Sequence, residues 1–260
     1  MGCSPFKEGK INLIEKINRG KKIKSFNFDN MNLHSLKILD NHEEITELTI
    51  FSAQHNKLNQ IPKKFFGSLT KINKLDFSFN NFDFIDEIIF NKTSLVSLNF
   101  SNNKISNIPD EITNLSNLKE LNLSHNNISR VNEKVSQLKN LEILILSSNH
   151  IEIFSNLLIQ MEKLETIEIN TNKISELPDN NWKISKIKNL DVSFNKLKKI
   201  PSNLLKDSKI SNMNLKANSI SKSNFLNTEG FEIFEKRRKE RKDQAYFRNL
   251  DISFNLCGLD

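Results

Sequence analysis

The histidines, cysteines and glycines are the residues that would signal catalysis or metal binding, and their arrangement argues against both. His55 and His125 stand 70 positions apart, too far for one metal ion or one catalytic pair. Cys3 and Cys257 lie near opposite ends of the chain. Six glycines in 260 residues leave little room for a glycine-rich phosphate loop. The sequence therefore predicts a protein that is not an enzyme and that holds no metal or cofactor.

Carboxylates and aromatic side chains remain as candidates, and their chemistry is recognition of a partner. Carboxylates attract cationic surfaces, and exposed aromatic side chains concentrate binding energy. The residues that this reasoning selects are Glu142, Glu165, Glu168, Asp191, Asp76, Phe79, Phe194 and His125. They are scattered along the chain, so a regular architecture is needed to bring them together.

A ladder of regularly spaced asparagines supplies that architecture. The asparagines are separated by one step of 24 residues and then six steps of 23, at Asn56, Asn80, Asn103, Asn126, Asn149, Asn172, Asn195 and Asn218. Each one has apolar residues eight, five and three positions before it and two positions after it, and all but Asn218 also have one five positions after it. Self-similarity at this period indicates a stacked repeat protein.

Each repeat has the composition of a short strand followed by a sharp turn. In the stretch LKELNLSHNNI, which begins at Leu118, the alternation of Leu121 and Leu123 has a period of two, so one strand face is buried and the other is free. Pairs such as Ile108-Pro109 and Leu177-Pro178 then begin the return segment, where proline gives up a donor that the turn does not need.

The pattern L-x-x-L-x-L-x-x-N-x-L over about residues 23–260 resembles the leucine-rich repeat, and the repeat length with its proline resembles the intracellular Ras-suppressor class. The resemblance implies an α/β fold: a leucine-rich repeat solenoid, or horseshoe, with a parallel concave β-sheet and short helices or turns on the convex side. It also implies that each ladder asparagine is buried and bonds the backbone of its turn. Stability is then a sum over neighbouring repeats.

The positions six, four, two and one before each asparagine are expected to face outward from the concave sheet. The position four before is polar to acidic, with Asp76, Glu168 and Asp191 among its members. Glu142 and Glu165 join Glu168 and Asp191 from neighbouring strands, which lie about 4.8 Å apart. The position one before carries His125, Phe79 and Phe194; the two phenylalanines either serve as interface anchors or pack on neighbouring strand residues.

The net charge of +7 invites a nucleic-acid interpretation, but the acidic character of the expected binding face opposes it. No nucleic-acid partner is predicted. The partner is expected to be a protein, and the resemblance to the Ras-suppressor class implies a small GTPase or a phosphatase catalytic subunit. The chain itself is expected to be a monomer.

The first residues, MGCSPFK, resemble the start of a dually acylated protein, with myristate on Gly2 and palmitate on Cys3. Phe6 departs from the usual acceptor pattern, which has Ser or Thr at this place. The alternative is an ordinary start of the chain before a helical cap at about residues 11–17. Because no signal peptide is apparent and the cysteines are few, we expect a cytoplasmic protein, at the cytoplasmic face of the plasma membrane if it is acylated.

Residues 229–246 interrupt the repeat pattern and predict a charged helix. The segment 229–243 contains six basic and five acidic residues, which favours a solvated helix over a nuclear import signal or a lipid-binding site at 236–239. The expected organisation is residues 1–22 as an N-terminal segment and cap, 23–228 as repeats, 229–246 as the helical insertion and 247–260 as a truncated final repeat.

These observations predict a non-enzymatic protein-binding scaffold, or adaptor, in intracellular signalling that binds its partner through the concave face. The alternative is a regulatory repeat fragment of a larger protein phosphatase or cyclase.

Overall fold

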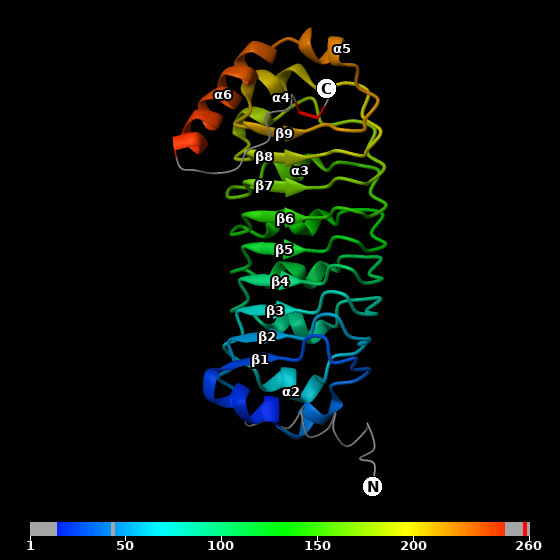
Figure 1. Cartoon of the computed structure of the whole chain (residues 1–260), viewed down its shortest axis with the longest axis vertical. Helices are drawn as coiled ribbons and strands as arrows, with labels where there is room; N and C mark the ends of the chain where they lie inside the picture. The colour runs from blue at the N-terminus through cyan, green and yellow to red at the C-terminus, as the bar shows by residue number, and fades with distance from the viewer. Residues whose placement is uncertain (1–14, 43–44, 248–256, 259–260) are drawn as a thin grey trace. The chain divides into compact units, whose positions relative to one another are not determined.

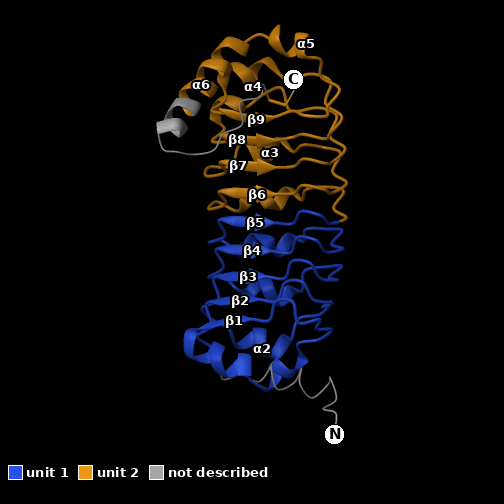
Figure 2. Cartoon of the chain, in the orientation of Figure 1, with its two compact units in different colours: residues 1–126 blue, residues 127–260 orange. Residues whose placement is uncertain are grey.

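A computed structural model describes residues 15–42, 45–247 and 257–258 of the chain (Figure 1). The chain forms two compact units, residues 1–126 and 127–260 (Figure 2). Gly2, Cys3 and Asn255 lie outside the described residues, as do most of the segments 1–22 and 247–260.

Within its described residues, unit 1 repeats a short strand followed by a helical turn. Its strands are β1 (Ser25–Asn27), β2 (Ile50–Ser52), β3 (Lys74–Asp76), β4 (Ser97–Asn99) and β5 (Glu120–Asn122), and its helical turns are η1 (Lys37–Asn41), α2 (Lys63–Ser68), η2 (Glu87–Asn91) and η3 (Asp110–Asn114). A helix at residues 15–23 precedes β1. The strands are parallel and pair in chain order, so that Leu75 faces Leu98 and Leu98 faces Leu121.

Unit 2 continues the same alternation. Its described strands are β6 (Ile143–Ile145), β7 (Thr166–Glu168), β8 (Asn189–Asp191) and β9 (Asn212–Asn214), and its helices are η4 (Glu133–Gln137), α3 (Asn156–Ile159), η5 (Trp182–Ile184), α4 (Ser202–Asp207), α5 (Lys222–Leu226) and α6 (Phe231–Phe247). Leu144 faces Ile167 and Ile167 faces Leu190 in a parallel register.

The core of each unit lies between the strands and the return segments. In every strand from β6 to β8 the middle residue is buried and its two neighbours are partly exposed, which is the expected result of period-two alternation. Unit 1 fills its core with phenylalanines: the Phe51 ring lies 5.0 Å from Phe66 and 5.3 Å from Phe77. Unit 2 uses mainly leucine and isoleucine, with the fully buried Trp182 of η5 among them.

The ladder asparagines connect the turns of successive repeats. The buried Asn126 side chain donates to the carbonyls of Phe100 and Leu123, each at 3.0 Å, and its Oδ1 accepts from the Ile105 amide at 2.9 Å. The same set of bonds recurs at Asn80 and Asn195. A buried amide is tolerated because all its polar atoms are paired with backbone groups that have no partner in the ladder of strands.

Helix α6 packs on α4 and is anchored in the core of unit 2. Phe234 is fully buried beside Phe225, at 6.2 Å between ring centroids. Arg237 donates to the carbonyls of Leu205 at 2.5 Å and Lys206 at 3.3 Å at the end of α4. The helix expected to be solvated therefore has one face in the core, although its other face is charged.

Candidate interaction surface

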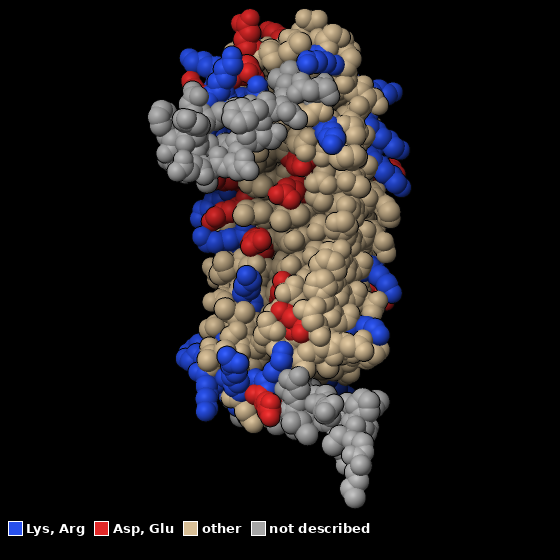
Figure 3. All heavy atoms as spheres, in the orientation of Figure 1, with Lys and Arg blue, Asp and Glu red and all other residues tan. Residues whose placement is uncertain are grey.

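The predicted binding residues fall into both units, and each group is described within its own unit. Unit 1 holds Asp76, Phe79 and His125. Unit 2 holds Glu142, Glu165, Glu168, Asp191 and Phe194. Glu142 directly precedes β6 and Glu165 directly precedes β7, whereas Glu168 ends β7 and Asp191 ends β8. Figure 3 shows Asp and Glu atoms on the viewed face over β7 and β8, with Lys and Arg atoms at the neighbouring edge.

Asp76 and Asp191 are engaged in the fold through both carboxylate oxygens. Oδ1 of Asp191 accepts from the amide and the hydroxyl of Ser193, at 2.9 and 2.6 Å, and Oδ2 accepts from the Asn214 side chain at 3.1 Å. Asp76 makes the equivalent bonds with Ser78 and Asn99. These aspartates therefore fix the backbone at the strand end and join it to the next repeat.

This structural role was missed when the sequence was read for binding residues. The signal is present as the pattern Asp-x-Ser, because a short carboxylate two positions before a serine bonds the serine amide in an Asx-type turn. Asn99 and Asn122 make the same bond to Ser101 and Ser124. The polar column four positions before the asparagine is thus largely a second ladder of hydrogen bonds.

Glu142 and Glu165 lie at an edge where lysines surround them. Glu165 forms an ion pair with Lys188 at 2.6 Å. A hollow of about 440 Å³ is lined by Glu142 and Glu165 together with Glu162, Lys163, Lys186, Lys188 and Lys209. The local charge at this edge is mixed, so the four predicted carboxylates do not form one acidic patch.

Glu168 differs from the other carboxylates of the sheet face. It ends β7, pairs in register with Asp191 of β8 and is partly buried. Its side chain has no hydrogen bond or ion pair to any of the described residues. Burial raises the pKa of Glu168, and the negative charge of Asp191 raises it further. A half-buried, unpaired carboxylate beside a like charge does not stabilise the fold.

Phe79, His125 and Phe194 share an unusual backbone conformation. Each precedes a ladder asparagine and lies in the left-handed region, with φ of 55°, 53° and 52°. The same position is left-handed in the other described repeats, where it is occupied by Asn30, His55, Asn102, Ser148, Thr171 and Ala217. Asparagine tolerates this conformation, whereas it costs a bulky residue about 1–2 kcal/mol.

Both phenylalanines remain exposed while touching one neighbour. Phe79 is 43% exposed and stacks on His55 with 4.0 Å between ring centroids. Phe194 is 50% exposed, and the Lys216 ammonium lies 5.9 Å from its ring. Each ring therefore lies beside one neighbour, as one of the two sequence-based alternatives predicts, and its use as an interface anchor stays a prediction.

Within the described residues, no group of three or more His, Cys, Asp or Glu side chains is arranged to hold a metal ion. Among the helices that the structure describes, none is long and apolar enough to cross a membrane.

Comparison with known families identifies the repeats. A family of leucine-rich repeats matches residues 93–151 and 117–174, and a family described as a BspA-type leucine-rich repeat region with six copies matches residues 2–111. No curated protein sequence matches the chain. The stacked parallel strands and the asparagine ladders have the α/β solenoid fold of leucine-rich repeat proteins, and leucine-rich repeat families match residues 2–174.

Solved structures agree with this assignment. A leucine-rich repeat protein of Leptospira interrogans is 26% identical, with a TM-score of 0.67 over 83% of this chain and 51% of that chain. The ectodomain of the Arabidopsis receptor kinase HAESA, solved with a peptide hormone ligand, is 31% identical, with a TM-score of 0.58 over 70% of this chain and 31% of that chain. An internalin of Listeria monocytogenes is 25% identical, with a TM-score of 0.57 over 65% of this chain and 47% of that chain. The chain thus spans about half or less of these structures.

Proposed function

We propose that this protein is a non-enzymatic scaffold that binds a protein partner through the strand-bearing face and its adjoining turns. Leucine-rich repeat proteins are commonly protein-binding scaffolds, and the receptor ectodomain to which this chain is similar is bound to a peptide. In unit 2 the binding surface centres on Glu168 and Phe194.

One observation supports this proposal above the others: the chain places exposed phenylalanines where the backbone disfavours them. At the same position of other repeats, Asn30 and Asn102 fit the left-handed conformation without strain. Phe194 adds backbone strain and leaves half of its surface in water. Neither effect stabilises the folded chain, whereas a large aromatic ring suits the centre of a protein interface.

Glu168 supplies the electrostatic part of the surface. Its carboxylate is unpaired among the described residues, and both burial and Asp191 disfavour its charge. A cationic side chain on a partner would relieve both effects, because an opposite charge nearby favours the ionised form. The partner is therefore expected to present Lys or Arg beside an apolar patch.

The partner class follows from the family resemblance, which points to a small GTPase or a phosphatase catalytic subunit in an intracellular signalling pathway. In this proposal the chain acts as a monomer and adds no chemistry of its own. A regulatory repeat portion of a phosphatase or cyclase would use the same surface toward a catalytic domain.

The test compares capture of partners by wild type and by the double variant Glu168→Gln/Phe194→Asn. Gln removes the destabilising charge and Asn relieves the left-handed strain, so neither change is expected to unfold unit 2. Captured proteins are identified, and the binding of each purified candidate is then measured directly. We expect the variant to lose at least about tenfold in affinity, because the centre of the interface is changed.

The matched control is Glu240→Gln/Phe84→Asn, which makes the same two replacements at exposed positions outside the proposed surface. It should capture the same proteins as wild type. Equal affinities for wild type and the Glu168/Phe194 variant would disprove the proposed surface, provided that both proteins melt cooperatively.

A cytoplasmic location at the membrane surface is part of the proposal and needs its own experiment. Two acyl chains hold a protein at a membrane far more firmly than one. Wild type is therefore expected in the membrane fraction of eukaryotic cells, and the variant Gly2→Ala/Cys3→Ser in the soluble fraction. Identical distribution of the two proteins would disprove the proposed acylation and would not bear on the proposed binding surface.

A further inference from the structure

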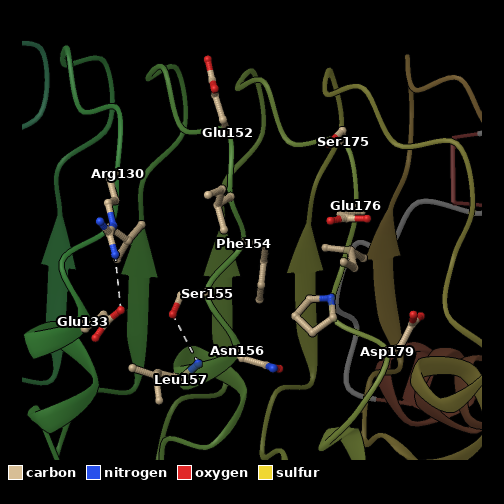
Figure 4. A pocket seen from close by; sticks show the side chains of 14 residues that line it. Arg130, Glu133, Glu152, Phe154, Ser155, Asn156, Leu157, Ser175, Glu176 and Asp179 are labelled. Atoms are coloured by element: carbon tan, nitrogen blue, oxygen red, sulfur yellow. Dashed lines mark hydrogen bonds and ion pairs between the residues drawn. The ribbon is translucent and has the colours of Figure 1, made fainter.

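A groove in unit 2, separate from the proposed binding surface, is formed by three successive segments that follow the asparagine turns. The segments are residues 130–133, 152–157 and 175–179, and they enclose about 510 Å³. Figure 4 shows Phe154 in the middle of the groove, with Glu133 and Asp179 on opposite sides. The volume is in the range of ligand clefts, about 300–1,000 Å³.

The three return segments that follow the groove are of different kinds. They form the 3-10 helix η4, the α-helix α3 and the 3-10 helix η5. The Ser155 hydroxyl accepts a hydrogen bond from the Leu157 amide at the start of α3. Before η5, the backbone carbonyl of Pro178 instead accepts from the Trp182 indole N–H at 2.6 Å.

The floor of the groove is apolar. Val131, Phe154 and Leu177 are the residues five positions after successive ladder asparagines, and they are nearly completely buried. Ile153 also lines the groove; it is 71% exposed and is the most exposed large apolar side chain in the described part of the chain. An apolar floor with a projecting isoleucine offers contact area to an apolar side chain of a ligand.

The sides of the groove are acidic. Glu133 is paired with Arg130 at 3.3 Å. Glu152, Glu176 and Asp179 also line the groove, and their carboxylates have no hydrogen bond or ion pair to the residues that the structure describes. The groove thus combines apolar contact area with three uncompensated negative charges.

We infer that this groove binds a cationic segment of a protein partner, in which a Lys or Arg side chain stands beside an apolar one. The apolar side chain would lie on Phe154 and Ile153, and the cationic group would reach Glu176 or Asp179. The charge complementarity excludes the other large classes of ligand: a nucleic acid or an anionic membrane would be repelled by the carboxylates.

The groove is distinct from the surface around Glu168 and Phe194, since the lining residues of the two do not overlap. Loss of one site is therefore expected to leave the other intact. A protein with two such sites would hold two partners, or two parts of one partner, at the same time.

The experiment selects peptides that bind wild type from a display library of random dodecapeptides. Peptides that also bind the variant protein Glu176→Lys/Asp179→Lys are then removed. We expect the enriched peptides to contain a basic residue next to an apolar one. Synthetic copies should bind wild type at least about tenfold more tightly than this variant, and more weakly at high salt. Hydrogen exchange should show protection at residues 152–157 and 175–179.

The matched control is Glu162→Lys/Glu240→Lys, which makes the same charge change at exposed positions outside the groove. It should bind the peptides like wild type. The milder variant Glu176→Gln/Asp179→Asn, which keeps the side-chain shapes, replaces the lysine variant if that protein does not fold.

Three results would overturn the inference. They are enrichment of no peptide or of peptides without basic residues, equal binding to the groove variant, and protection confined to other segments. Sedimentation equilibrium provides a further check. If wild type is a dimer and the groove variant is a monomer, a second copy of the chain occupies the groove, and the inference of a separate partner is wrong.

Discussion

At the scale of single residues, carboxylates in the same column of the repeat have unlike roles. Asp191 is held through both oxygens by Ser193 and Asn214, whereas Glu168 beside it has no such bonds to the described residues. Two positions after Glu168 stands Asn170 instead of a serine, and the Glu168 carboxylate accepts no hydrogen bond from it. Position in the repeat therefore does not by itself make a residue available to a partner.

The pKa of Glu168 leads to a prediction about pH. Because this pKa is raised in the folded protein, ionisation of Glu168 lowers the free energy of unfolding. The protonated side chain carries no such cost below the ordinary glutamate pKa, about 4.3, and the cost develops as the pH rises through the folded value. Glu168→Gln should therefore raise the free energy of unfolding at neutral pH by up to about 1 kcal/mol, allowing for solvent screening. Below about pH 4 the gain should vanish.

Urea unfolding of wild type and Glu168→Gln across this pH range measures the effect. The exposed Glu162→Gln serves as the control and should follow wild type at each pH. A gain that is the same in acid and at neutral pH would show that the charge of Glu168 is not its cause.

At the scale of elements, helix α6 shows how a charged segment is anchored to a stack of repeats through α4. Arg237 donates to the carbonyls of Leu205 and Lys206 in α4 and of Ile210 in the segment after it, and Arg238 pairs with Glu235 at 2.6 Å. Lys239 also lies within 3.9 Å of Glu235, so three of the four basic residues at 236–239 are engaged within the unit. This arrangement disfavours the use of the segment as a basic docking signal.

Arg237→Ala should lower the free energy of unfolding by about 2–3 kcal/mol, because it leaves three carbonyls without their charged donor. Lys239→Ala, at an exposed position of the same helix, should change it by less than about 0.5 kcal/mol. Thermal unfolding followed by circular dichroism distinguishes the two. Equal effects would mean that α6 contributes no specific cap.

Two glycines of unit 1 provide a second comparison between elements. A Cβ at Gly20 would lie 2.1 Å from a carbon of the Phe26 ring, whereas one at Gly67 in α2 would meet nothing within 4 Å. Gly20→Ala should therefore destabilise the protein by about 1–3 kcal/mol through overpacking. Gly67→Ala should stabilise it by about 0.5–1 kcal/mol, since alanine favours the helix. Melting temperatures that move in the same direction would contradict this account of the helix at 15–23.

At the scale of the whole molecule, each compact unit is a one-dimensional stack in which a repeat contacts its neighbours along the chain. The asparagine ladder carries this coupling, because the Asn195 side chain bonds the backbone of its own repeat and of the one before it. The stability of such a stack is approximately a sum of repeat and interface contributions. Damage at an inner interface should therefore cost more than damage near the end.

Asn195→Ala removes a buried side chain that satisfies Ile174, Ile169 and Val192. It should destabilise unit 2 by about 3 kcal/mol, since the backbone groups that remain are buried. Asn218→Ala makes the same change at a partly exposed ladder position, where water replaces the side chain, and should cost about half as much. Urea unfolding measures both, and the reverse order would argue against stability by neighbour coupling.

The fold was predictable from the sequence because its information is periodic. The spacing of Leu118, Leu121 and Leu123 before Asn126 implies a short strand and a turn wherever it recurs, and the resemblance to leucine-rich repeats implied the parallel sheet. Those features depend on residues close together in the chain. The Ras-suppressor class, the acylation and the partner type remain predictions.

The candidate surface was predictable only in part. The sequence placed Glu165, Glu168 and Asp191 on neighbouring strands, but it did not show that Lys188 neutralises Glu165 or that Ser193 and Asn214 occupy Asp191. These partners come from another repeat or from the turn geometry. The left-handed backbone at Phe194 and the groove around Phe154 were also outside what the sequence pattern showed.

The sequence by itself determined the repeated strand and turn, because burying one face of a period-two strand needs only local alternation and a neighbour of the same kind. Only the tertiary structure decided which polar groups are free to bind a partner. Residues that are one repeat apart in the sequence become adjacent when the repeats stack, and their hydrogen bonds and ion pairs determine whether Glu168, Asp191 or Glu176 faces solvent unpaired.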